Sequence, residues 1–136
     1  MADRQSARWY GPDAGEIEAL AMRAISALPA QFRAHLGNVA VIVRETPDAE
    51  MLASVDLDDP MELSGLYTGR PVSAKNIEES GALPDMIHLF RQPILAEAAQ
   101  DGIPLATLVH HIVVHEIGHH FGLSDEDMHA LEELAD

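Results

Sequence analysis

One stretch near the C-terminus constrains the fold more than any other. Residues 115–125 read His-Glu-Ile-Gly-His-His-Phe-Gly-Leu-Ser-Asp, and they close a mostly apolar run that begins at Pro104. On an α-helix, residues four apart lie one turn above each other, so His115 and His119 can offer imidazole nitrogens to one metal ion. An apolar helix is buried by its neighbours, and its polar residues mark a pocket or an edge. The sequence therefore predicts a buried helix that carries a metal site.

The residues around these histidines fit a catalytic zinc site. Such a site has three protein ligands and one open position. Gly122 can adopt the left-handed conformation that ends helices, which would bring the next residues back toward the ion. Asp125 is then the candidate third ligand, and His129, one turn further along a final helix, is the alternative. Glu116 would flank the open position, where a water binds, and is the candidate general base.

Two further side chains are candidates for contact with a substrate. At about 100° per residue, His111 falls on the same helical stripe as His115 and His119. It can be a substrate contact or a partly buried histidine bonded to a carbonyl, and the sequence leaves both interpretations open. Tyr67 and His111 are also the candidates for stabilising an oxyanion.

Composition excludes several classes of function. The chain has 8 Lys and Arg against 23 Asp and Glu, a formal charge of −15, so phosphate backbones would be repelled and nucleic-acid binding is not expected. It has no cysteine, which leaves histidine and carboxylate as metal ligands. No signal peptide or membrane-spanning run is found. We therefore expect a cytoplasmic monomer with no membrane partner.

Periodicity and turn signals divide the rest of the chain. Asp13 and Glu16 resemble a capping box that opens a helix, which stops at Leu28-Pro29. The β-branched run at 39–43 favours a central strand buried on both faces. The other predicted elements are a helical turn at 48–53, an edge strand at 64–71, a strand at 86–91, and helices at 94–100, 104–121 and 125–135.

These elements fit one domain. We expect residues 1–12 to form a flexible leader, residues 13–136 a single domain, and residues 72–84 an irregular segment. His88, inside a strand, is expected to be a hydrogen-bonded structural residue. The edge strand at 64–71 could pair with an extended peptide by β-addition.

The motif and its flanking segments resemble a known family. Residues 115–125, preceded by Leu-Tyr-Thr-Gly at 66–69 and Ile-His-Leu-Phe-Arg-Gln-Pro-Ile at 87–94, are similar to the minimal zincins, small bacterial zinc metallopeptidases. The resemblance spans roughly residues 14–134. It implies an α+β fold, in which a small mixed sheet packs against helices. It also implies zinc held by His115, His119 and Asp125, with Glu116 as the catalytic carboxylate.

Three functions compete on this evidence. The first is a zinc peptidase that acts on peptides or proteins through a metal-activated water. The second is a zinc-binding protein whose metal is structural or whose activity has been lost, for which a closed fourth coordination position would be diagnostic. The third is an acidic protein-interaction module. Glu116 favours the first, because a structural site has no use for a carboxylate beside an open position.

Overall fold

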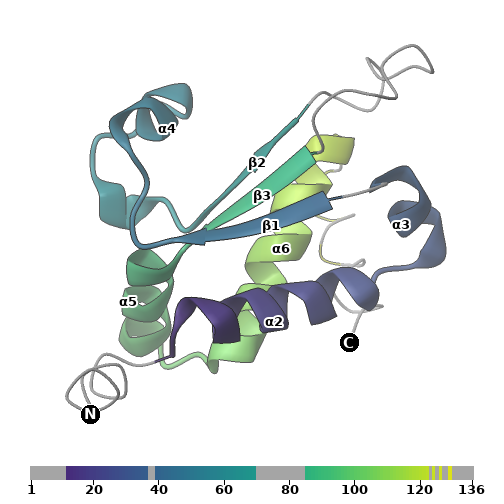
Figure 1. Ribbon diagram of the computed structural model, residues 1–136, viewed down its shortest axis with the longest axis horizontal. Helices are drawn as coiled ribbons and strands as arrows, with labels where there is room; N and C mark the ends of the chain where they lie inside the picture. The colour runs from purple at the N-terminus through teal and green to yellow at the C-terminus, as the bar shows by residue number, and fades with distance from the viewer. Residues whose placement is uncertain are drawn as a thin grey trace.

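The centre of the molecule is a small mixed sheet (Figure 1). The computed structural model describes residues 12–36, 39–69, 85–122, 124, 126 and 129. Its three strands are β1 (Val39–Arg44), β2 (Gly65–Thr68) and β3 (Asp85–Phe90), in the order β1-β3-β2. β1 is parallel to β3, and β2 is antiparallel to it. Together with the helices, this confirms the predicted α+β fold with a small mixed sheet.

The prediction of a central strand at 39–43 is wrong, because among the described strands β1 lies at an edge of the sheet and β3 is central. Val41 and Val43 of β1 pack against the core but keep some exposure, whereas Ile87 and Leu89 of β3 are fully buried. An apolar β-branched run indicates that side chains are covered on the faces of a strand. It does not indicate whether both backbone edges are paired.

Two helices, α2 (Ala14–Ser26) and α6 (Leu105–Phe121), pack on one face of the sheet and against each other. The predicted N-cap is confirmed, since Asp13 accepts a hydrogen bond of 2.9 Å from the backbone N–H of Glu16. Among the described residues, no helix is long and apolar enough to cross a membrane. The core between these layers includes Ile17, Ala21, Leu28, Ile87, Leu89, Leu108, Val109, Val113, Val114 and Ile117.

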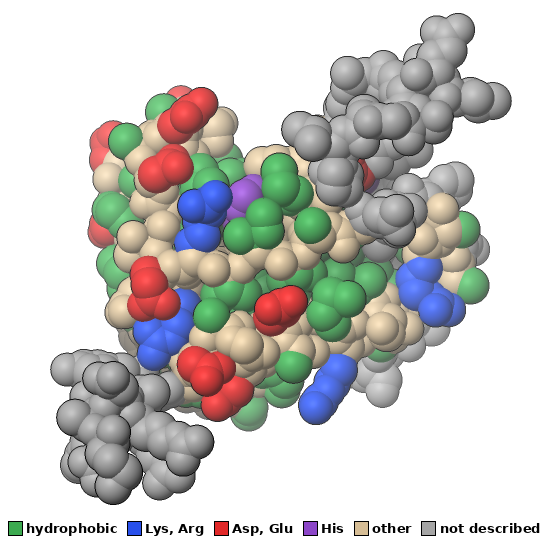
Figure 2. Space-filling view, in the orientation of Figure 1, with side chains coloured by type: hydrophobic (Ala, Val, Ile, Leu, Met, Phe, Trp, Pro, Cys, Tyr) green, Lys and Arg blue, Asp and Glu red, His purple; other side chains and the backbone are tan. Residues whose placement is uncertain are grey.

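A second, smaller apolar cluster involves the opposite face of the sheet. Phe90 of β3 is buried there with Leu52 of α4 (Ala49–Ser54) and Leu63, which follows the short 3-10 helix η1 (Pro60–Glu62). Figure 2 shows acidic side chains gathered over the region of α4. Two acids before α4 and η1 have structural roles: Asp48 accepts a hydrogen bond from the N–H of Met51, and Asp59 accepts one from the N–H of Met61.

The remaining helices show where the predicted bounds differ. Helix α3 (Ala30–Leu36) differs from the prediction of a helix stop at Leu28-Pro29, because proline also suits the start of a helix. Helix α5 (Arg91–Asp101) begins three residues before the predicted bound, with Pro93 in its first turn. The predicted leader (apart from Pro12), the segment at 72–84 and most of the final helix at 125–135 lie outside the described residues.

Candidate metal centre

Helix α6 brings together the two histidines of the motif. The imidazole rings of His115 and His119 meet edge to face with centroids 4.3 Å apart. Their ligand atoms and a carboxylate oxygen of Glu116 all lie within 4.8 Å of one another. Among the described residues, these three form the group of histidines and acids that could hold a metal ion. The geometry fits one ion bound by nitrogen and oxygen donors.

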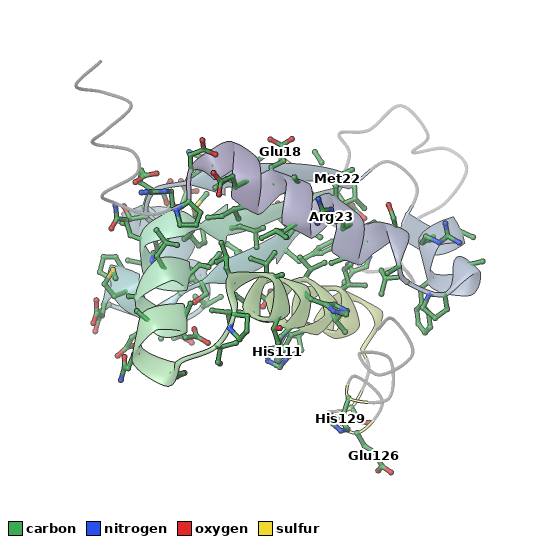
Figure 3. All side chains as sticks on the ribbon, turned by 90° about the horizontal axis from the view of Figure 1, so that it is seen from below. Glu18, Met22, Arg23, His111, Glu126 and His129 are labelled. Atoms are coloured by element: carbon green, nitrogen blue, oxygen red, sulfur yellow. The ribbon has the colours of Figure 1, made fainter. Side chains whose placement is uncertain are left out.

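The side of α6 that carries the histidines is not covered by α2. Figure 3 shows His111, one turn before His115, on the side of α6 that faces away from α2. The rings of His111 and His115 are also in edge contact, with centroids 5.7 Å apart. His111 and His119 are both exposed. The site therefore lies at the surface of the molecule. The two ring contacts confirm that His111, His115 and His119 share one stripe of α6.

Glu116 points toward the edge strand β2. The backbone N–H of Tyr67 donates to Glu116 Oε1 over 3.3 Å. The N–H of Phe90 donates to the carbonyl of Ser64, so residues 64 and 90 form a hydrogen-bonded pair. Hydrogen-bonded and non-hydrogen-bonded pairs alternate along an antiparallel ladder. Tyr67, which lies opposite Ile87 and three residues after Ser64, is therefore in a non-hydrogen-bonded pair. Its N–H faces away from β3, toward the outer edge of the sheet where Glu116 receives it.

Partial burial changes the acidity of Glu116. Desolvation raises its pKa above the ordinary value, while the nearby His119 and the hydrogen bond from Tyr67 act in the opposite direction. Burial is the largest of these effects. A carboxylate with a raised pKa is a stronger base, which suits a group that must accept a proton from water.

The comparison with known families agrees with this geometry. A family model described as zincin-like metallopeptidase matches residues 36–134. The chain belongs to this family. The match covers the three described strands and the candidate metal-binding motif on α6. A search of curated proteins finds no match.

Close contact between β2 and α6 of this zincin-like metallopeptidase depends on Gly65. A Cβ atom at position 65 would lie 2.7 Å from Cγ2 of Ile112 and 3.5 Å from Cγ of Glu116. The first of these distances is shorter than van der Waals contact. Glycine therefore allows the helix to approach the strand closely enough for Glu116 to reach the N–H of Tyr67.

We expect Gly65→Ala to destabilise the fold by about 1–3 kcal/mol, the usual cost of overpacking a well-packed core. Denaturant unfolding would measure the change. The Ile112→Ala background provides the control, because it removes Cγ2 and so removes the clash. In that background Gly65→Ala should cost close to nothing, since contacting residues are non-additive. An equal cost in both backgrounds would mean that the close contact is not the cause.

The two candidates for the third metal ligand follow α6 in the sequence. Asp125, the candidate third ligand, lies outside the described residues. The alternative ligand His129 is exposed and lies beyond the end of α6 near Glu126 (Figure 3). The helix end required by both assignments is confirmed, because Gly122 has a left-handed φ of 71°.

Tyr67 and His88 have structural partners. The hydroxyl of Tyr67 donates to Asp85 over 2.8 Å, so it is directed at a buried acid and not at the metal-binding group. His88 is buried in β3, with Nε2 3.4 Å from the hydroxyl oxygen of Thr68, and desolvation lowers its pKa. This confirms the prediction of a structural, hydrogen-bonded histidine.

Two polar residues near the site were not identified from the sequence. Asp85 is only 7 % exposed, although an acid at the start of an apolar strand is usually solvated. The side chain of His120 lies in the interior beside Tyr67. The only signal available was that both are polar residues inside apolar runs.

Proposed function

We propose that the protein is a zinc-dependent peptidase in which His115, His119 and Asp125 bind the metal and Glu116 is the general base. The observation that carries this proposal is the placement of Glu116. Its carboxylate lies within 4.8 Å of the ligand atoms of both histidines and also accepts the N–H of Tyr67. A carboxylate fixed beside a histidine pair is what proton transfer during hydrolysis requires.

The donors at this site suit zinc. Imidazole nitrogen and carboxylate oxygen are common zinc ligands, and the chain has no cysteine that could replace them. When bound, zinc would polarise the scissile carbonyl and lower the pKa of a water. Glu116 would then take a proton from the attacking water as the water oxygen bonds to the carbonyl carbon. It would deliver that proton to the amide nitrogen as the C–N bond breaks, which leaves a carboxylic acid and an amine.

The substrate is proposed to be an extended peptide that lies along β2. This strand is at the edge of the described sheet. The backbone groups of Gly65 and the carbonyl of Tyr67 face outward there, while the N–H of Tyr67 is bound to Glu116. A peptide that adds to this edge would pass beside Glu116. Main-chain hydrogen bonds would supply affinity with little dependence on sequence. The cytoplasmic location and the monomeric state remain predictions from the sequence.

Cleavage of a diverse peptide mixture, read by mass spectrometry, tests the proposal. Zinc-loaded wild type is compared with chelator-treated wild type and with Glu116→Gln of equal metal content. Cuts made only by the zinc-loaded wild type would support the peptidase and show its sequence preference. If zinc is retained and no peptide is cut, the peptidase proposal is wrong. A structural or inactive metal site would then be favoured.

A further inference from the structure

Three side chains from three elements meet in the interior next to the metal centre. The hydroxyl of Tyr67 on β2 donates to Asp85 Oδ2 at the start of β3 over 2.8 Å. The ring of His120, in the last turn of α6, stacks on that of Tyr67 with centroids 4.3 Å apart and an interplanar angle of 22°. His120 Nε2 lies 3.7 Å from the same Oδ2 atom. These three residues are called the buried polar cluster.

Strand register explains how the cluster forms. Tyr67 lies opposite Ile87 in the ladder, and Asp85, two residues before Ile87, points to the same face of the sheet. Such a diagonal pair is within reach of an aromatic side chain. Gly69 provides the space, because a Cβ atom there would collide with the carboxylate of Asp85. The cluster is therefore built into the pairing of β2 with β3.

Because the cluster is buried, the loss of a hydrogen bond within it is costly. The side chains of His120 and Asp85 are 4 % and 7 % exposed, and a buried carboxylate is costly unless donors reach it. Desolvation raises the pKa of Tyr67, and so do its hydrogen bond to Asp85 and the charge of that acid, so the hydroxyl stays protonated and remains a donor. Displacing the ring of Tyr67 would leave the carboxylate without this donor.

The cluster contacts the proposed catalytic site at two points. The same Tyr67 whose hydroxyl binds Asp85 donates its backbone N–H to Glu116 over 3.3 Å. His120 directly follows the candidate ligand His119. Protein N–H···O hydrogen bonds usually span about 2.7–3.2 Å, so the bond to Glu116 is already long. A small displacement of β2 relative to α6 would break it.

We propose that Tyr67, Asp85 and His120 form a positioning cluster that holds the outer edge of β2 against the last turns of α6 and thereby keeps the N–H of Tyr67 on Glu116. This role rests on the proposed function insofar as Glu116 is the base. The cluster does not contact the reacting atoms. It acts by fixing the orientation of the base and the position of the edge along which the substrate would lie.

Hydrogen exchange of backbone amides in the zinc-loaded protein tests this proposal without any substrate. The readout is the protection of the residue 67 amide divided by that of Leu66, whose amide belongs to a hydrogen-bonded pair with His88. Glu116→Ala should lower this ratio about tenfold, which would establish that the residue 67 amide reports the bond to Glu116. Tyr67→Phe should also lower it about tenfold. A general loss of structure would lower the protection of both amides together and leave the ratio unchanged.

Thr68→Val is the matched control. It removes one hydroxyl from the neighbouring residue, whose side chain points to the opposite face of the sheet toward His88, and it should leave the ratio unchanged. Asp85→Asn is the second variant, because it keeps the size and one acceptor oxygen. Its ratio should fall between those of wild type and Tyr67→Phe. On a cleaved peptide, Tyr67→Phe should lower kcat about tenfold and change KM less.

The outcomes separate this inference from the proposed function. An unchanged ratio in Tyr67→Phe, or in Glu116→Ala, would overturn the positioning role. If wild type cuts no peptide while Tyr67→Phe still lowers the ratio, the peptidase proposal fails. The proposal that the cluster maintains the hydrogen bond between Tyr67 and Glu116 would still be supported.

Discussion

Glu116→Gln is expected to lower the rate of peptide hydrolysis by about 10²–10⁴-fold, the range that general acid–base catalysis contributes in enzymes. Glutamine keeps the size and can still accept the N–H of Tyr67, so the contact between α6 and β2 should survive. It cannot take a proton from water. Steady-state kinetics on a peptide that wild type cleaves would measure the loss, which should appear in kcat.

Zinc affinity decides whether Glu116 is a base or a ligand. Glu116 belongs to the same group of close ligand atoms as His115 and His119. If Asp125 is the third ligand, Glu116→Gln should bind zinc as tightly as wild type in a titration against a chelator. A loss of about 100-fold would instead make Glu116 a metal ligand, and the catalytic role assigned to it would be wrong.

The metal-free protein should show the raised pKa of Glu116 as a dependence of stability on pH. Burial raises this pKa above its ordinary value of 4.5, so between these two values the folded state binds more protons than the unfolded state. The free energy of unfolding then falls as the pH rises through this interval. Glu116→Gln has no such titration. Its thermal midpoint relative to wild type should therefore be lowest near pH 4 and increase toward neutral pH. A constant difference would contradict the shift.

Removal of a metal ligand is the second large effect. Apparent binding energies of about 10–16 kcal/mol for zinc sites with four ligands correspond to roughly 2.5–4 kcal/mol per ligand. His119→Ala should therefore weaken zinc binding by about 10²–10³-fold, and Asp125→Ala should have an effect of the same order. Competition with a chelator of known affinity would measure both.

Two other histidines provide matched controls for the ligand variants. His111→Ala removes an exposed imidazole from the same stripe of α6, and His129→Ala removes the alternative third ligand. Both should bind zinc as wild type does. If His129→Ala lost zinc and Asp125→Ala did not, the third ligand would be His129. The stability of wild type should also rise with zinc concentration, because only the folded state assembles the site.

Local spacing predicted much of the metal centre. His115 and His119 are four residues apart, which places them on one face once the segment is a helix. Gly122 ends that helix with a left-handed φ that glycine tolerates. Sequence could not predict which backbone group meets Glu116. That depends on the pairing phase of β2 with β3 and on the space left by Gly65, both of which involve residues remote along the chain.

The sequence by itself determined which residues α6 presents together, because helical geometry repeats every 3.6 residues whatever surrounds it. The resemblance to the minimal zincins implied a small mixed sheet packed against helices. Only the tertiary structure decided that β3 is central and β1 an edge among the described strands, since the sequence of a short apolar strand does not specify its neighbours. It also decided that Tyr67, Asp85 and His120 meet in the interior. Their contact depends on the packing of three elements, and no local sequence pattern predicts such packing.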